Sequence, residues 1–136
     1  MSKHELKDLE VFIVDDDEAI RDSLSMYLGS LGVIVRCACN PIDALAELKK
    51  KPAGVVISDV RMPQMDGMTF LKELKTTYGD DTEVLIITGH SNEALAIEAL
   101  KNGAFDYFRK PLHAREVVES LKRTKRYNDL KQENAQ

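Results

Sequence analysis

The sequence lacks tryptophan, has only two cysteines among its 136 residues, and contains no long apolar run. The longest aliphatic stretch, residues 84–87, is far shorter than the ~20 residues that a membrane-spanning helix requires. The N-terminal residues also carry no apolar segment of a signal peptide. These absences lead us to expect a cytoplasmic protein with no membrane partner.

The scarcity of cysteine excludes most thiol chemistry. Two thiols are too few for a structural zinc site, and Cys37 and Cys39 are too close in sequence for an ordinary disulfide across a strand. Their alternation with Ala38 places both on one face of a predicted strand. We expect reduced thiols that contribute to packing rather than to redox chemistry.

A surplus of positive charge is also absent. The net charge is -4 and the sequence pI is about 5.4, which argues against a direct nucleic-acid partner bound through its phosphates. Hydrophobic residues make up 43% and charged residues 31%, so the chain is too apolar for a disordered segment. Its length is that of one globular domain.

Short apolar runs alternate with amphipathic segments along the chain. The runs, which predict strands, are residues 11–14, 33–35, 55–58, 84–87 and 105–108. The segments between and after them predict helices over 19–31, 41–51 and 68–78, another from Ser91 to Gly103, and a last one from about His113. This pattern predicts an α/β fold with a doubly wound five-stranded parallel sheet in a three-layer α/β/α sandwich. A barrel would need eight such units.

Polar residues follow four of these predicted strands. Asp15 and Asp16 follow the first, Asp59 the third, Thr88 the fourth and Lys110 the fifth. The carboxyl ends of parallel strands share one edge of the sheet, where ligands bind. Each residue alone is typical of an ordinary loop or cap, but together they predict one functional site.

The crowding of acids in this predicted site indicates its chemistry. Two carboxylates ~4 Å apart repel each other by about 4 kcal/mol at an effective dielectric constant of 20. Lys110 alone cannot balance three acids, and oxygen ligands without histidine or cysteine favour Mg²⁺. We expect Asp15 and Asp16 to hold the metal, Asp59 to act as a nucleophile toward phosphorus, and Thr88 to donate to a phosphoryl oxygen.

The motifs that carry these residues resemble the receiver domains of two-component response regulators. They are Val14-Asp15-Asp16-Asp17, the run from Ser58 to Gly67, Thr88-Gly89-His90, and the run from Tyr107 to Pro111. The resemblance covers about residues 9–122 and is greatest to receivers of ATPase-type transcription activators. It implies a flavodoxin-like sheet with strand order 2-1-3-4-5.

The resemblance also implies a role for each residue of the site. Asp59 would accept a phosphoryl group from a sensor histidine kinase, and Mg²⁺ would be bound by Asp15, Asp16, Asp59 and the backbone carbonyl of Arg61. Lys110 would pair with the carboxylate and then with the phosphate, and the Lys110–Pro111 peptide bond would be cis. Such a domain is regulatory and is not an enzyme beyond its own phosphorylation and dephosphorylation.

The same resemblance assigns Thr88 and Tyr107 as the switch residues. Their rearrangement would change the surface of the fourth helix, fifth strand and fifth helix, which would control an output domain after residue 136 or a partner. Gly89 would leave room for the phosphoryl group, while Arg61 and His90 would tune dephosphorylation.

The predicted receiver leaves a segment at each end of the chain. We expect an N-terminal extension over residues 1–8, the receiver over 9–122, and a helical extension or linker over 123–136. The basic run at residues 122–126 favours a solvated helix face, and the heptads are too few to predict a stable coiled coil. A homodimer could form through the fourth helix, fifth strand and fifth helix, or through the C-terminal helix.

Three other function classes remain open from the sequence. A flavin-binding redox protein could share this sheet, although acids occupy its phosphate-binding loop. A phosphatase or phosphotransferase could use Asp15 as its nucleophile, although the chain has no room for a cap over a substrate. A constitutive binding module with an unused acid site is the third.

Overall fold

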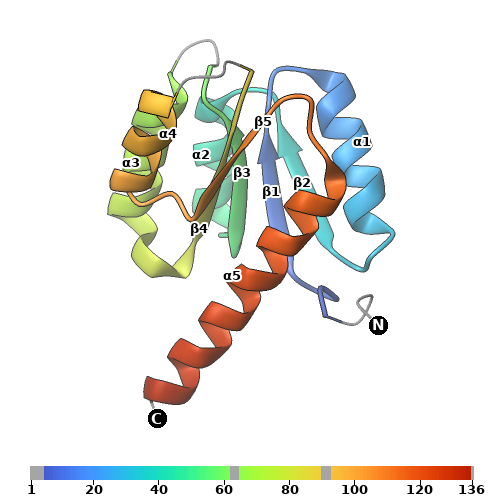
Figure 1. The fold of residues 1–136 in the computed structure, drawn as a ribbon, viewed down its shortest axis with the longest axis vertical. Coiled ribbons are helices and arrows are strands. Elements are labelled where there is room, and N and C mark those ends of the chain that lie inside the picture. The colour runs from blue at the N-terminus through green and yellow to red at the C-terminus, as the bar shows by residue number, and fades with distance from the viewer. Residues whose placement is uncertain (1–4, 62–64, 90–92, 136) are drawn as a thin grey trace.

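The computed structural model describes residues 5–61, 65–89 and 93–135. Its sheet has five parallel strands in the order β2-β1-β3-β4-β5, as predicted. The strands are β1 (Glu10–Val14), β2 (Ile34–Ala38), β3 (Val55–Asp59), β4 (Glu83–Thr88) and β5 (Asp106–Arg109). Figure 1 shows this sheet at the centre of the molecule.

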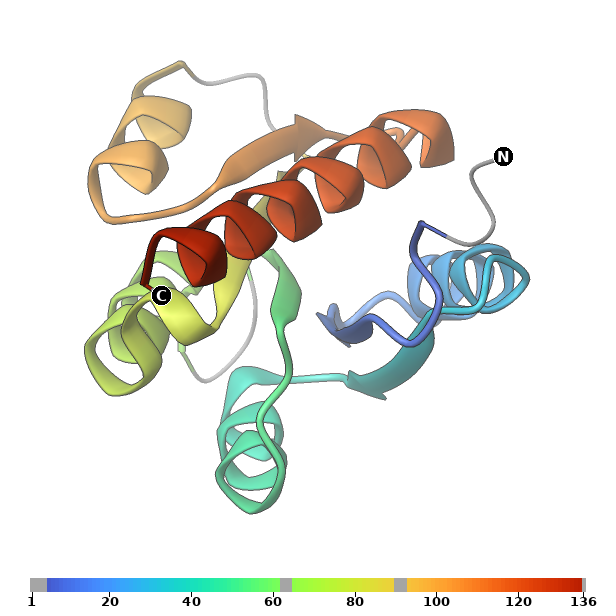
Figure 2. The same ribbon diagram turned by 90° about the horizontal axis from the view of Figure 1, so that it is seen from below.

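Helices connect the strands and cover both faces of the sheet. They are α1 (Glu18–Gly29), α2 (Pro41–Lys50), α3 (Gly67–Tyr78), α4 (Glu93–Lys101) and α5 (Ala114–Ala135), with a short 3-10 helix, η2 (Gly79–Asp81), after α3. The helices α1 and α5 lie on one face, and α2, α3 and α4 lie on the other (Figures 1 and 2). The predicted doubly wound three-layer fold is therefore confirmed.

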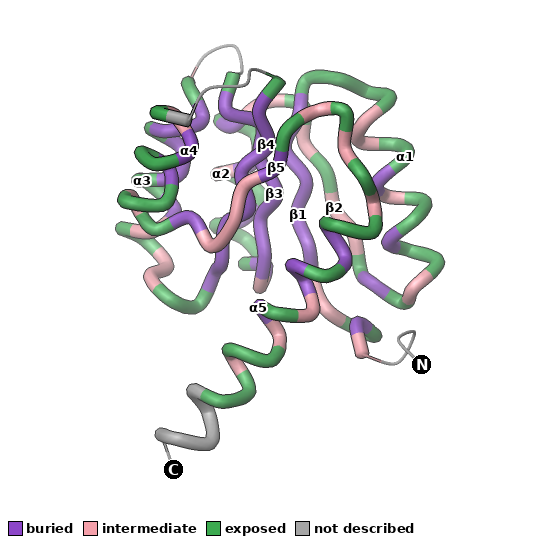
Figure 3. Tube along the Cα trace, in the orientation of Figure 1, coloured by how far each residue is buried: buried purple, intermediate pink, exposed green. Residues whose placement is uncertain are grey.

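Alternate residues of each central strand pack into two separate hydrophobic cores, one on each face of the sheet. In β1, Phe12 and Val14 pack toward α2, α3 and α4, whereas Val11 and Ile13 pack toward α1 and α5. Every residue of β3 and β4 is buried (Figure 3). Strands buried on both faces explain the continuous apolar runs in the sequence.

Polar side chains set the first turns of three helices. Asp17, Asn40 and Asp66 are the N-caps of α1, α2 and α3, and each side chain accepts a hydrogen bond from a backbone N–H of its own first turn. The caps of α1 and α3 lie just beyond β1 and β3. They therefore fix the chain where it leaves the sheet beside the predicted site.

The structure corrects two details near the edge of the sheet. Helix α1 ends at Gly29, two residues before its predicted end, while the left-handed turn occurs later, at Gly32 with φ 89°. Cys37 and Cys39 are exposed free thiols, the first on the edge strand β2 and the second just after it. The prediction that they contribute to packing is wrong.

Segments near both ends of the described chain contact the folded core. Leu6 and Thr124 are fully buried, and α5 continues without a break from Ala114 to Ala135 before projecting away from the sheet (Figure 1). The predicted C-terminal extension is thus helical. Within the described ranges, no helix has the length and apolar character needed to cross a membrane.

Candidate functional site

Three carboxylates meet at the carboxyl end of the sheet. One oxygen from each of Asp15, Asp16 and Asp59 lies within 4.8 Å of the other two. Asp15 and Asp59 are buried, whereas Asp16 is exposed. The short β1–α1 loop supplies the first two acids and the end of β3 supplies the third. Two acids of the site are therefore shielded from solvent, and the third faces it.

Asp15 is the most strongly buried acid of the cluster. Its Oδ1 accepts a hydrogen bond from the backbone N–H of Asp17 at 2.9 Å, but its Oδ2 is buried without a hydrogen-bond partner. The nearest cation is Lys110, whose Nζ lies 3.5 Å from that oxygen. Burial raises the pKa of Asp15, and the charge of Asp59 raises it further, against the opposing effect of the Asp17 hydrogen bond.

Asp59 has closer partners on both of its oxygens. Lys110 Nζ donates to Oδ2 at 2.7 Å, and the backbone N–H of Arg61 donates to Oδ1 at 3.0 Å. Burial alone would lower the pKa of Lys110, but the hydrogen bond and charge of Asp59, together with the charge of Asp15, raise it above its usual value. Lys110 therefore remains protonated and holds Asp59 at the centre of the site.

A second cation, missed in the sequence, holds the β1–α1 loop. Arg21 Nη1 donates to the backbone carbonyl of Asp15 at 2.6 Å. Arg21 lies in the first turns of α1, so the helix that the Asp17 side chain caps also fixes the residue preceding Asp16. The only sequence signal for this contact is an arginine six residues after the first acid.

The start of α3 packs directly against the backbone of the proposed nucleophile. The N–H of Gly67 donates to the carbonyl of Val60 at 2.8 Å. A Cβ at Gly67 would lie 2.5 Å from Asp59 O and 2.5 Å from Val60 Cα, distances that no side chain tolerates. Glycine is therefore required for this close approach. The sequence offered the signal, a glycine immediately before a predicted helix, but not the reason.

The remaining predicted residues lie on β4, β5 and the loop after β5. Thr88 is buried at the end of β4, and its carbonyl accepts a hydrogen bond from the backbone N–H of Lys110 at 2.8 Å. The Lys110–Pro111 peptide bond is cis, as the resemblance implied. Tyr107 is half-buried and packs against the core that includes Ile86. The ends of β4 and β5 are thus linked beside Asp59.

The structure brings Asp15, Asp16, Asp59 and Lys110 into one cluster. A Cβ at Gly89 would meet only Lys110 Cδ, at 3.9 Å, so this position borders the cluster without crowding it. Arg61 is exposed two residues after Asp59, and its N–H contacts the acid. His90, predicted to tune dephosphorylation, lies outside the described residues.

The chemistry of this cluster suits a divalent cation and a phosphoryl group. Carboxylate oxygens are the ligands that Mg²⁺ prefers, and Asp15 Oδ2 is a buried oxygen without a hydrogen-bond partner. One ammonium beside three carboxylates leaves an excess of negative charge. The donor set therefore fits Mg²⁺, with Asp59 placed between the acids and Lys110.

Comparison with known proteins gives one consistent result. The family model of the response regulator receiver domain matches residues 11–122. The C4-dicarboxylate transport transcriptional regulatory protein DctD of Rhizobium meliloti (strain 1021) is 35% identical over 91% of this chain and 27% of its own length. The chain spans 27% of the length of DctD, 49% of TodT, 56% of TmoT and 26% of NtrC from Proteus hauseri.

Solved structures agree with the family model. NtrX from Brucella abortus, in complex with ADP, has a TM-score of 0.88 and 28% identity over 94% of this chain and 29% of that chain. The beryllofluoride-activated NtrC4 receiver domain dimer has a TM-score of 0.82 and 31% identity over 87% of this chain and 97% of that chain. These relatives are regulators of the DctD, NtrC and NtrX type. They confirm the predicted resemblance to receivers of ATPase-type transcription activators. With this sheet, this acid cluster and these relatives, the chain belongs to the response regulator receiver domain family of two-component systems.

Proposed function

We propose that this receiver is a phosphorylation-dependent switch whose phosphoacceptor is Asp59. A sensor histidine kinase is the donor: an oxygen of Asp59 bonds to phosphorus, the phosphorus–nitrogen bond of the phosphohistidine breaks, and the freed nitrogen takes up a proton. The observation that carries the proposal is the position of Asp59, a buried carboxylate between two further acids and the Lys110 ammonium.

The proposed metal is Mg²⁺, held by Asp15, Asp16, Asp59 and the backbone carbonyl of Arg61. When bound, Mg²⁺ supplies positive charge that offsets the charge of the phosphoryl oxygens. The buried Oδ2 of Asp15 supports this assignment, because it has no hydrogen-bond partner and its ion pair with Lys110, at 3.5 Å, is shared with Asp59. Arg21 supports it indirectly by fixing the loop that carries Asp15 and Asp16.

The chain's own residues do the rest of the chemistry. Lys110 is a catalytic residue in this proposal, because its ammonium contacts Asp59 and stays close to the transferred phosphoryl group. Thr88 would donate its hydroxyl to a phosphoryl oxygen from the end of β4. The raised pKa of Lys110 favours its role, since the ammonium remains charged throughout the pH range of the cell.

Thr88 and Tyr107 are the proposed switch residues. A phosphoryl group adds a charge of about -2, and it favours the arrangement of the β4 and β5 ends that contacts it best. Thr88 and Lys110 share a backbone hydrogen bond, so a shift at one end affects the other. The proposed readout is the surface formed by α4, β5 and α5.

That surface would act in the cytoplasm on an output domain after residue 136 or on a partner. The greater length of the curated relatives supports an output domain. A homodimer through α4, β5 and α5 or through the C-terminal part of α5 is a further element of the proposal. It is supported by the dimer named for the NtrC4 receiver.

The proposal is tested by incubating the chain with Mg²⁺ and acetyl phosphate and measuring intact mass. We expect wild type to gain one phosphoryl group, and Asp59→Asn or chelation of Mg²⁺ to abolish the gain. Asp17→Asn is the matched control, because it removes a neighbouring carboxylate while asparagine keeps the helix cap.

Two results would reject this assignment. The same gain in Asp59→Asn would move the phosphoacceptor to another residue. No gain in wild type, with no structural response to Mg²⁺ and beryllofluoride, would favour a constitutive binding module instead.

A further inference from the structure

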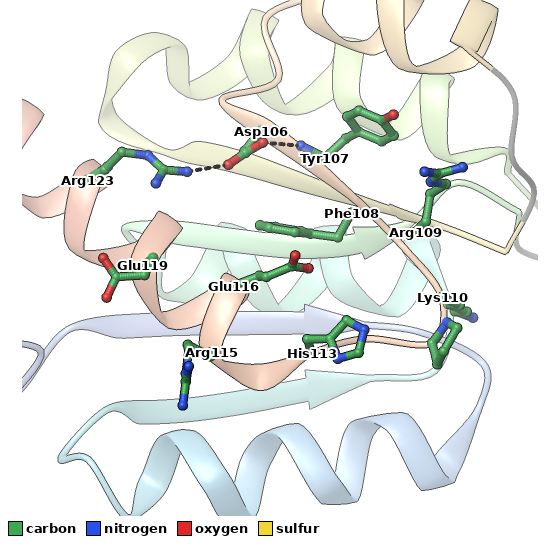
Figure 4. Close-up of a pocket in the computed structure, with 11 residues that line it drawn as sticks. Asp106, Tyr107, Phe108, Arg109, Lys110, His113, Arg115, Glu116, Glu119 and Arg123 are labelled. Atoms are coloured by element: carbon green, nitrogen blue, oxygen red, sulfur yellow. Dashed lines mark hydrogen bonds and ion pairs between the residues drawn. The ribbon is translucent and has the colours of Figure 1, made fainter.

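A carboxylate outside the acid cluster joins the start of β5 to the helix α5. Asp106 opens β5, and its Oδ1 accepts a hydrogen bond from the backbone N–H of Tyr107 at 2.8 Å. Its Oδ2 accepts two more, from Ser120 Oγ at 2.9 Å and from Arg123 Nη2 at 2.7 Å. Figure 4 shows Asp106 between Tyr107 and Arg123. One side chain thus contacts both a proposed switch residue and α5.

The contacts of Asp106 lie where α5 makes its last attachments to the domain. Ser120 and Thr124 are fully buried, and the ring of Tyr127 lies 6.1 Å from that of Phe105, the residue before Asp106. Beyond this point Leu130 is 57% exposed and the helix projects away from the sheet (Figure 1). The chain around Asp106, together with the ion pair of Arg126 and Glu5 at 3.1 Å, therefore sets where the free part of α5 begins and in which direction it leaves.

The attachment of α5 at this point depends on all the hydrogen bonds that Asp106 accepts, and not only on its ion pair with Arg123. The side chain of Arg123 is 52% exposed, so solvent weakens its pairing with Asp106. Ser120 is buried, and removal of Asp106 would leave its hydroxyl without that acceptor. The Tyr107 N–H would lose its side-chain acceptor at the same time. A single substitution would therefore remove the hydrogen bonds that join Asp106 to α5, while the Phe105–Tyr127 contact would remain.

We propose that Asp106 is a positioning residue that couples Tyr107 to the C-terminal half of α5. This proposal rests on the proposed function, because Tyr107 is assigned there as a switch residue. A change in the Tyr107 backbone alters the acceptor geometry of the neighbouring carboxylate, and this carboxylate holds Ser120 and Arg123. The direction of the helix that leaves the domain then depends on the state of β5.

The test follows backbone amide exchange in α5 of the full chain, with Mg²⁺ and with or without acetyl phosphate. In wild type we expect phosphorylation to change the exchange of residues 123–135. In Asp106→Ala we expect this exchange to be roughly tenfold faster before phosphorylation and to be unchanged by it. Labelling of Asp59, measured by intact mass in the same samples, should be retained.

We call the contacts of Asp106 with Tyr107, Ser120 and Arg123 the clamp. Matched variants distinguish loss of the clamp from a general loss of charge or of the fold. Glu116→Gln and Arg115→Gln remove exposed charges from the same helix, and both should behave as wild type. Asp106→Asn keeps an acceptor oxygen and should give an intermediate result. Arg123→Gln removes the exposed partner and should accelerate exchange less than Asp106→Ala does, which keeps the test valid if Asp106→Ala fails to fold.

Each remaining outcome has a defined meaning. Unchanged exchange in both Asp106→Ala and Arg123→Gln would show that no clamp exists. If exchange in Asp106→Ala is faster before phosphorylation but still responds to it, Asp106 is a structural contact only. The proposed coupling would then be wrong. Absence of Asp59 labelling in wild type would instead reject the proposed function, while the basal exchange would still show whether the clamp exists.

Discussion

Asp15 is buried with one oxygen that has no hydrogen-bond partner, and its pKa is raised by burial and by the charge of Asp59. A carboxyl group with a higher pKa in the folded state binds its proton more tightly there than in the unfolded chain. The metal-free fold therefore loses stability as the pH rises from about 4 through the raised pKa of Asp15. Asp15→Asn removes this loss.

We expect metal-free Asp15→Asn to be more stable than wild type at neutral pH, by about 1 kcal/mol or more, with the difference vanishing near pH 4. Urea unfolding in a chelator across this pH range measures it. Added Mg²⁺ should stabilise wild type much more than the variant. A wild-type chain that is the more stable of the two at pH 7 without metal would contradict this account.

Arg21 gives a second prediction at the scale of one residue. Arg21→Gln loses a charge-assisted hydrogen bond to the Asp15 carbonyl, so it should destabilise the fold by about 1 kcal/mol and weaken Mg²⁺ binding several-fold. Calorimetric titration with Mg²⁺ checks the affinity. Arg21→Lys should recover part of it, whereas Arg115→Gln, on an exposed face of α5, should leave it unchanged. Equal Mg²⁺ affinity in Arg21→Gln and wild type would exclude this positioning role.

At the scale of elements, the junction of β3 and α3 leaves no space for a side chain at Gly67. Gly67→Ala would place a methyl group 2.5 Å from Asp59 O, and we expect it to destabilise the fold by about 3 kcal/mol or more. Gly29→Ala is the control, because no atom lies within 4 Å of its Cβ and it ends a helix. Denaturation should show the control neutral or slightly stabilised. Comparable losses in both variants would reject the packing argument.

Elements buried on both faces were the easiest to predict from sequence. The apolar runs at β3 and β4 are continuous because both cores use them, and Pro41 and Gly103 mark helix limits by their backbone preferences. The end of α5 was harder, because its later residues are polar and no periodicity marks them. Contacts far apart in sequence, such as Arg123 with Asp106, hold that part of the helix.

The acid cluster was predictable for a topological reason. Parallel strands end at one edge of the sheet, so Asp15, Asp59 and Lys110 had to meet once the strands were identified. The contacts of Arg21 and Asp106 were not predictable, because each depends on how a helix is rotated against the sheet. Sequence patterns define which face of a helix is apolar but not which distant carbonyl or carboxylate its charged residues reach.

At the scale of the whole molecule, α5 keeps contacts with the rest of the domain past residue 122. A chain ending at residue 122 would lose Arg123, the buried Thr124 and the Tyr127 ring contact with Phe105. We expect it to be less stable than the full chain by about 1–3 kcal/mol. A chain ending at residue 128 should match the full chain in thermal unfolding.

The two shortened chains also show whether a loss of stability comes from lost specific contacts or from a shorter helix. If stability fell steadily with every residue removed, helix propensity rather than specific contacts would be responsible. A single step between residues 122 and 128 is the result expected here. Asp59 labelling by acetyl phosphate should be retained in both chains, because neither truncation reaches the acid cluster.

The close contact between Gly67 and the backbone of Asp59 limits the directions in which the domain can rearrange. On that side the backbone of Asp59, the proposed phosphoacceptor, is in close contact with the first turn of α3. On the other side Gly89 leaves ordinary van der Waals space beside Lys110. A rearrangement caused by the proposed phosphorylation of Asp59 would therefore find space toward β4 and β5 rather than toward α3.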